Sequence, residues 1–180
     1  MRKIVVTEFV SLDGVMENPA WTFIYGNDEI EKYKLDELLA SDALLLGRVT
    51  YEAFASAWPS ATDEQGFADR MNSMSKYVIS TTLKTAVWNN SSLIKGNVVA
   101  EIIRLKHTFG ENILVGGSCT LVQTLIQNNL VDEYRFLVYP VILGSGKRIF
   151  LDGANATLKL VETKTFGDVT ALVYHPSQSK

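Results

Sequence analysis

The chain has 180 residues, of which 47% are hydrophobic and 21% are charged, so it is long enough for one folded domain and too hydrophobic for a disordered segment. Its net charge of −3 argues against a nucleic-acid binder, and no apolar run approaches the roughly 20 residues that span a bilayer. One cysteine allows no internal disulfide, which indicates a reducing, cytoplasmic setting, and two separated histidines with that cysteine make a metal site improbable.

Strands and helices are predicted to alternate through the first two thirds of the chain. Runs rich in Val, Ile and Leu are typical of buried strands, and they fall at residues 3–10, 43–46, 77–80 and 113–115. Apolar residues at helical spacing lie between and after these runs, and the helices are expected to begin at Asn27, Arg48, Thr62, Asn97 and Ser118. Asn27, Asn97 and Ser118 would act as N-caps, and a capping-box pattern from Thr62 to Gln65 would open the third helix.

The last third of the chain has no helix between its predicted strands, which cover residues 132–142, 157–166 and 168–175. Gly167-Asp168 between the last two is typical of a hairpin turn. Short apolar strands between helices indicate a parallel sheet covered on both faces. We therefore predict a three-layer α/β/α fold whose mostly parallel central sheet finishes with antiparallel strands. One domain over residues 1–176 and a tail at 177–180 are expected.

Two strand ends carry groups that suit a phosphate or a ribose, and open α/β sheets bind ligands beyond the carboxyl ends of their strands. Gly47 and Arg48 join a buried strand to a helix, so the amides of the helix start and a guanidinium would meet an anion, with Thr50 adding a hydroxyl. The next buried strand is followed by the hydroxyls of Ser80, Thr81 and Thr82. Each stretch has an alternative: a turn with a solvated arginine, and a turn capped by a hydroxyl.

Gly116, Gly117 and Ser118 follow the strand at residues 113–115. Glycines between a strand and a helix either turn the chain or let a ligand approach the backbone closely, and the residues alone leave both interpretations open. Cys119 comes next. It either lies at a helix N-terminus, which would lower its pKa, or is an ordinary buried thiol.

Asp13 lies in the stretch Ser11-Leu12-Asp13-Gly14 after the first strand. Asp-Gly forms turns readily, but the same position would place a carboxylate at the mouth of a cleft, where it could handle a proton. Trp21, a little further on, either walls a pocket for an aromatic ring or belongs to the core.

Five stretches, taken together and in this order, resemble the dihydrofolate reductase fold. They are SLDGVME, LLLGRVTYE, YVISTTL, ILVGGS and YPVILGSGKRIF, and they span nearly the whole chain. The sequence is most similar to the branch that contains the reductase domain of the bifunctional riboflavin-biosynthesis deaminase/reductase, here as a stand-alone domain. GRVTYE with a downstream VGGS is specific for the fold and its cofactor, and less specific for the substrate.

The resemblance implies an enzyme that uses NADPH to reduce a C=N or C=O group of a small heterocyclic or ribosylated substrate, as 5-amino-6-(5-phosphoribosylamino)uracil reductase does. It assigns the cofactor to Gly47, Arg48, Thr50, Ser80, Thr81, Thr82, Gly116, Gly117, Ser118 and Cys119. A strained peptide at the two glycines, with a cis bond as one form of it, is also implied. Replacing Gly117 by Val is then expected to cost cofactor affinity far more than fold stability.

The substrate side is assigned by the same resemblance. Gly144, Gly146 and Lys147 would help to shape a site for a phosphorylated ribosyl-pyrimidine, with Trp21 in its wall. The proton would come from solvent or from Asp13, which is therefore the candidate catalytic residue.

Two other functions stay open. Folate reductases place a carboxylate early in the first helix to grip the pterin, and Asp28 and Glu31 compete for that position. A nucleotide-binding or sensing protein without turnover is the other alternative. A small molecule is the expected partner, with neither nucleic acid nor membrane, and a homodimer through the apolar strand at residues 135–139 is weighed against that strand lying in the core.

Overall fold

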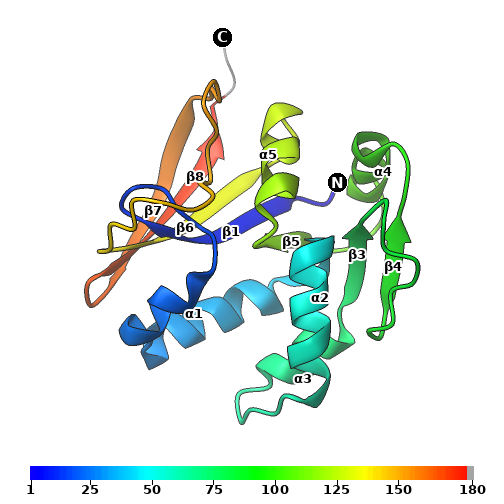
Figure 1. Cartoon of the computed structure of the whole chain (residues 1–180), viewed down its shortest axis with the longest axis horizontal. Helices are drawn as coiled ribbons and strands as arrows, with labels where there is room; N and C mark the ends of the chain where they lie inside the picture. Colours follow the sequence, from blue (N-terminus) through cyan, green and yellow to red (C-terminus); the bar gives the residue numbers. More distant parts are fainter. Residues whose placement is uncertain (178–180) are drawn as a thin grey trace.

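Eight strands form one sheet in the order β4-β3-β2-β5-β1-β6-β8-β7 in the computed structural model, which describes residues 1–177 (Figure 1). The strands are β1 (Ile4–Ser11), β2 (Ser41–Gly47), β3 (Ser75–Ile79), β4 (Ser91–Ile94), β5 (Asn112–Gly116), β6 (Glu133–Tyr139), β7 (Leu158–Phe166) and β8 (Val169–Pro176). All pairs among the first six strands are parallel, whereas β8 pairs antiparallel with both β6 and β7. The predicted change from parallel to antiparallel pairing is confirmed.

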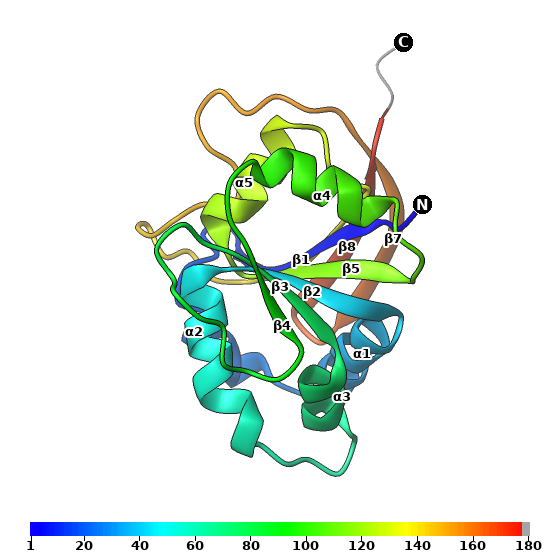
Figure 2. The ribbon, with the colours of Figure 1, turned by 90° about the vertical axis from the view of Figure 1, so that its right-hand side faces the viewer.

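Helices cover both faces of this sheet (Figure 2). They are the 3₁₀ helices Pro19–Tyr25 and Trp58–Ser60 and the α-helices α1 (Asp28–Leu39), α2 (Arg48–Ala57), α3 (Phe67–Ser73), α4 (Val98–Lys106) and α5 (Cys119–Gln127). α4 and α5 pack on one face, where Ile102 and Leu125 meet Ile4 and Ile113 of the sheet. α1, α2 and α3 pack on the other face. The predicted three-layer α/β/α fold is confirmed.

Local differences from the predicted elements have physical causes. β4 was not predicted, because its serines mask a strand that pairs with only one neighbour, β3. The third helix begins at Phe67 rather than near Thr62, because the Asp63 carboxylate accepts the amides of Phe67 and Ala68 in place of the expected capping box. No helix among residues 1–177 is long and apolar enough to cross a membrane.

The ends of the sheet bear on two further expectations. β6 lies between β1 and β8, so the strand at residues 135–139 is core and its backbone is paired on both sides. The amide of Ser177 donates to the carbonyl of Thr157, and the rest of the expected tail lies outside the described residues.

Candidate active site

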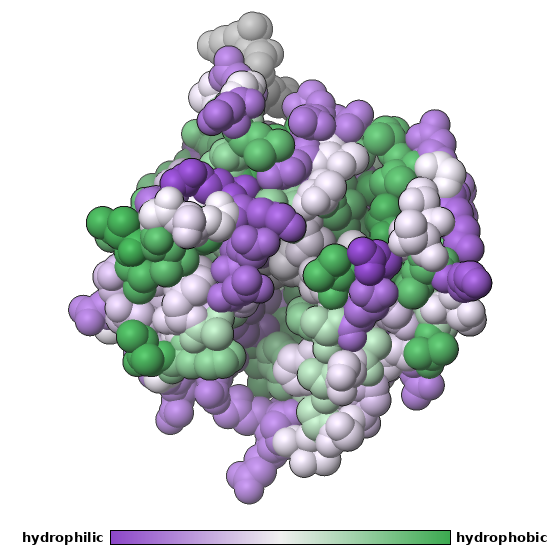
Figure 3. Space-filling view, in the orientation of Figure 1, coloured by the Kyte–Doolittle hydropathy of each residue, from purple (hydrophilic) through white to green (hydrophobic). Residues whose placement is uncertain are grey.

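A cavity of about 770 Å³ opens at the carboxyl ends of the parallel strands, within the usual size range for small-molecule and cofactor sites. Thr7 is the last residue of β1 that pairs with β5, opposite Gly116, so β1 continues past β5 and leaves a gap beside it. The surface is hollowed near the middle of the face in Figure 3, beside α2. The cavity therefore lies where β5 stops short between β1 and β2.

All ten residues that the resemblance assigns to the cofactor lie in the wall of this one cavity: Gly47, Arg48, Thr50, Ser80, Thr81, Thr82, Gly116, Gly117, Ser118 and Cys119. They come from the ends of β2, β3 and β5 and from the first turns of α2 and α5. Three sequence stretches that lie far apart in the chain thus meet at one edge of the sheet.

The two helices that start at the cavity have no side-chain cap. The side chains of Asn27 and Asn97 accept hydrogen bonds from backbone N–H groups in the first turns of α1 and α4. The N-cap residues of α2 and α5 form no such bond. The predicted capping role of Ser118 is wrong because its Oγ accepts the amide of Gly47 instead, at 2.8 Å. The first amides of α2 and α5 therefore have no partner within their helices or from a cap, which suits an anion.

The turn after β5 is held by backbone geometry. Gly117 has φ +67° and Ser118 has φ 61°, and no peptide bond among residues 1–177 is cis, so the strain is in φ and the expected cis bond is absent. A Cβ on Gly117 would lie 3.1 Å from Thr50 Oγ1. A Cβ on Gly116 would have no heavy-atom neighbour nearer than 3.8 Å. The turn itself thus requires Gly117, so Gly117→Val should cost fold stability as well as affinity, contrary to the sequence-based expectation.

Ser80, Thr81 and Thr82, which follow β3, fit both predicted interpretations: a turn capped by a hydroxyl, and hydroxyls that face a ligand site. Ser80 is buried, and its Oγ accepts the amides of Thr82 and Leu83, so it caps a turn. Thr81 and Thr82 are exposed on that turn and belong to the cavity wall. The capped turn is what presents their hydroxyls to the cavity.

Cys119 is not an activated thiol. Burial raises its pKa, and the positive charge of Lys147 only partly offsets that rise. Its Sγ lies 3.4 Å from the carbonyl of Arg148 and accepts from Gln123 Nε2 at 3.1 Å. The thiol therefore serves as a wall group, in agreement with the ordinary-thiol interpretation.

Asp13 lies outside the cavity wall. Its carboxylate accepts from Ser11 Oγ at 2.7 Å and from the amides of Leu143 and Gly144 at 3.1 and 2.8 Å. These bonds, the one from Ser11 first, lower the pKa of Asp13 to about 2. A carboxylate that is ionised and occupied in this way joins two loops and is poorly suited to donate a proton, so the structure favours another residue for that role.

The remaining predicted substrate residues do not gather in one place. Gly144 is exposed outside the cavity, and Gly146 packs so closely on Val15 that an added Cβ would lie 2.6 Å from Val15 Cγ1. Lys147 is in the wall of the cavity, and it also borders a neighbouring hollow of about 400 Å³ that includes Gly146. Trp21 packs edge-on against Tyr139, away from the cavity wall, and donates Nε1–H to the carbonyl of Glu17.

Glu8 is a cavity residue that the sequence analysis missed. Its side chain is buried, Oε2 accepts the amide of Gly117 at 3.0 Å, and Oε1 has no hydrogen-bond partner among residues 1–177. Burial, the largest cause, raises the pKa of Glu8 well above its usual value. A glutamate inside a strand covered on both faces was the available sequence signal.

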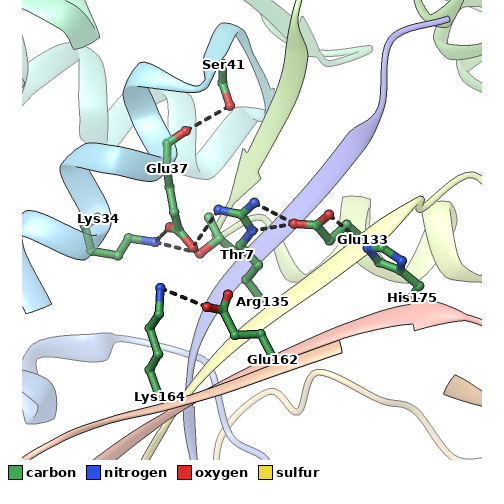
Figure 4. A network of polar contacts seen from close by, with 9 residues as sticks. All are labelled: Thr7, Lys34, Glu37, Ser41, Glu133, Arg135, Glu162, Lys164 and His175. Atoms are coloured by element: carbon green, nitrogen blue, oxygen red, sulfur yellow. Dashed lines mark hydrogen bonds and ion pairs between the residues drawn. The ribbon is translucent and has the colours of Figure 1, made fainter. Parts of the chain in front are cut away.

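Lys34 is the second missed residue, and it is the contribution of α1 to the cavity wall. Its ammonium donates to Thr7 Oγ1 at 2.6 Å and to Glu37 Oε2 at 2.5 Å (Figure 4). Asp28 and Glu31, the candidate folate carboxylates, are exposed and do not line the cavity. The first helix therefore presents a cation to the cavity where folate reduction would need an anion.

A partly buried polar network holds Lys34 in place (Figure 4). Glu37 lies between Lys34 and Arg135, whose Nη1 is 3.7 Å from Glu37 Oε1. Arg135 pairs with Glu133 at 2.6 Å, and the Glu133 carboxylate accepts from His175 Nε2 at 3.0 Å. Although burial alone raises the pKa of Glu133, its bonds to these two neighbours lower it overall. The network thus links α1 to β6 and β8.

Comparison with known proteins matches this architecture. The family model of the RibD C-terminal domain matches residues 2–172. The uncharacterized protein YyaP of Bacillus subtilis (strain 168) is 32% identical over 179 residues, which cover 97% of this chain and 95% of YyaP. A Shewanella sp. PV-4 protein named for riboflavin biosynthesis superposes with a TM-score of 0.80 at 19% identity, covering 98% of this chain and 99% of that one. Dihydrofolate reductase from Enterococcus faecalis, complexed with NADP(H), superposes at 0.64 and 12% identity over 98% and 97% of the chains. The two solved structures share the fold.

Proposed function

The chain belongs to the RibD C-terminal domain family, and on that premise we propose that it is an NADPH-dependent reductase. The observation that carries the proposal is the convergence of ten assigned cofactor residues on one cavity. The uncapped first turns of α2 and α5 fit a pyrophosphate, and the exposed hydroxyls after β3 fit a ribose and its phosphate. When bound, NADPH supplies a hydride.

The protein's part on the cofactor side is binding and orientation. The bond from the Gly47 amide to Ser118 Oγ holds the two strand-to-helix turns together, so their free amides keep a fixed spacing. Among the described residues Arg48 pairs only with Glu52, and its side chain is about half exposed, so part of its guanidinium can meet a phosphate. If that phosphate is the ribose 2′-phosphate, which NADH lacks, Arg48 would favour NADPH over NADH.

On the substrate side, the ammonium of Lys34 has three N–H donors, of which Thr7 and Glu37 accept two. The third suits a carbonyl or anionic oxygen of the substrate. Phe9, whose ring centroid lies 5.3 Å from the ammonium, adds an apolar wall for a ring. A small heterocycle that carries a carbonyl oxygen on its ring, as a ribosylated pyrimidine can, fits this wall better than a pterin that needs a carboxylate.

The test is titration of the purified protein with NADPH and with NADH, followed by nicotinamide fluorescence and by melting temperature. NADPH at about 100 times its Kd should stabilise the fold by about 2.7 kcal/mol. That corresponds to a rise of about 5–11 °C for a chain of this size. No binding of either cofactor would refute the proposal, and tight binding without oxidation across a panel of substrates would instead support a sensing protein.

A matched pair of variants tests the cofactor preference. Arg48→Met removes the guanidinium at the cavity, whereas Arg104→Met removes one from a similarly exposed ion pair on α4. Arg48→Met should weaken NADPH binding about tenfold or more, which corresponds to a loss of about 1.4 kcal/mol of binding free energy, and should weaken NADH binding less. Equal affinities in the two variants would remove Arg48 from the cofactor site.

A further inference from the structure

Glu8 differs from the other buried glutamates of the described chain. Glu37 and Glu133 are each held by at least one positively charged partner, whereas Glu8 forms no ion pair within residues 1–177. Only 4% of Glu8 is exposed, and the backbone amide of Gly117 is its one hydrogen-bond donor. A carboxylate with one amide donor and no cation is poorly compensated at such burial.

The charged groups that face Glu8 come from both covering layers. From α1, the ammonium of Lys34 lowers the pKa of Glu8 and the carboxylate of Glu37 raises it. From α5, Cys119 is the titratable neighbour, and Glu8 contributes to the raised pKa of that thiol. Burial exceeds all of these effects, so the pKa of Glu8 is raised and its neutral carboxylic acid is favoured more than that of a glutamate in water.

The place of Glu8 suits a proton donor. Glu8 Oε2 accepts a hydrogen bond from the amide of Gly117, which belongs to the turn assigned to the cofactor. The backbone of Glu8 lies where β1 extends past the end of β5. Oε1 is buried and has no protein acceptor among the described residues, so a proton carried there has no partner until a ligand brings one. A substrate nitrogen or oxygen bound beside the cofactor turn is such an acceptor.

We propose that Glu8 is the general acid of the reduction. The hydride carries two electrons to the carbon of the C=N or C=O bond, that double bond becomes a single bond, and the proton of Glu8 forms the new N–H or O–H bond. Glu8 is left as a carboxylate and regains its proton from solvent, so the sum is substrate plus NADPH plus H⁺ giving reduced substrate plus NADP⁺. This inference rests on the proposed reductase function and names its proton donor.

Glu8→Gln is the decisive variant because its amide oxygen can still accept from Gly117 and its size is unchanged, but it carries no acidic proton. Glu29→Gln makes the same substitution on the exposed first turn of α1, away from the cavity wall. NADPH oxidation is followed by stopped flow from about pH 6 to about pH 9, with 5-amino-6-(5-phosphoribosylamino)uracil and a panel of small C=N and C=O compounds. NADPH affinity is measured in parallel.

We expect Glu8→Gln to bind NADPH like the wild type and to oxidise it about 100-fold or more slowly, with Glu29→Gln unchanged. The wild-type rate should fall as pH rises and the acid form is lost, and Glu8→Gln should lack that fall. Glu8→Asp, which keeps the acid, should restore part of the pH dependence. A merely structural Glu8 would give Glu8→Gln the wild-type rate and pH profile, which would overturn the inference.

Infrared spectroscopy provides a readout without turnover. The difference spectrum between wild type and Glu8→Gln at pH 7 should contain the C=O stretch of one protonated carboxyl, and its absence would overturn the proposal. If the wild type binds NADPH but reduces no compound, the proposed function fails and the acid role fails with it. If the wild type reduces a compound and Glu8→Gln matches its rate, only the role of Glu8 is refuted.

Discussion

The two adjacent glycines at the end of β5 have separable roles, and alanine at each position tests them. Gly117 has a left-handed φ of +67°, and a methyl group there would press on Thr50 at 3.1 Å. A left-handed conformation costs an L-residue about 1–2 kcal/mol, and the contact adds to that. For a chain of this length the melting temperature should fall by at least about 2–8 °C.

Gly116→Ala should behave in the opposite way. Its added methyl group would meet no protein atom closer than 3.8 Å, so the fold should be unchanged, or slightly stabilised by the lower entropy of the unfolded chain. The methyl group would, however, stand in the wall of the cavity where we place the cofactor. NADPH affinity should weaken about tenfold or more, the equivalent of about 1.4 kcal/mol.

Differential scanning fluorimetry and an NADPH titration on both variants decide the matter. Gly117→Ala with a wild-type melting temperature would contradict the argument from φ and from Thr50. Gly116→Ala with the wild-type Kd for NADPH would show that the cofactor does not pass over this strand end. Each result bears on a separate glycine, so one can fail while the other holds.

Three further predictions concern charged side chains. Glu37→Gln should lower the free energy of unfolding by about 3 kcal/mol in chemical denaturation because it removes a buried charge that pairs with half-buried Lys34, whereas Glu162→Gln, in an exposed pair, should change it by less than about 1 kcal/mol. The pKa of Asp13 in the folded protein is about 2, below its ordinary value of 3.8, so its ionised form stabilises the fold above about pH 4 and this contribution is lost as the pH falls towards 2. The difference in melting temperature between wild type and Asp13→Asn should therefore narrow over that pH range, and a constant difference would refute this prediction. Lys34→Met should reduce kcat/KM for a carbonyl-bearing substrate about tenfold or more with NADPH affinity unchanged, while Lys32→Met, on the exposed side of α1, should be neutral in the same steady-state assay.

The part of the cavity wall that we assign to the cofactor could be predicted from the sequence because it is made of local signals. A strand end, one or two glycines and a helix start are adjacent in the chain, and parallel strands bring such ends to one edge. Gly47 and Gly116 were therefore expected at one edge of the sheet without any knowledge of strand order, and both line the cavity. The glycine turn required the structure, because neither the φ of Gly117 nor its contact with Thr50 is visible in the sequence.

The substrate side could not be predicted in the same way because its contacts are long-range. The carboxylate of Asp13 was available for catalysis in the sequence, but it is occupied by amides about 130 positions further along the chain. Glu8 and Lys34 showed no motif, since their chemistry depends on burial and on partners from other elements. The sequence left Trp21 either as the wall of a pocket or as part of the core, and its packing on Tyr139 favours the core.

This division has a consequence for specificity. The cofactor wall uses backbone amides and small residues, whose positions are set by the parallel strands, while the substrate wall uses Lys34, which is held through Glu37 and Arg135 by the antiparallel part of the sheet. Substitutions in that network would reposition Lys34 without touching the turns after β2 and β5. We therefore expect such substitutions to change substrate preference while NADPH affinity is kept, because the two walls are supported by different strands.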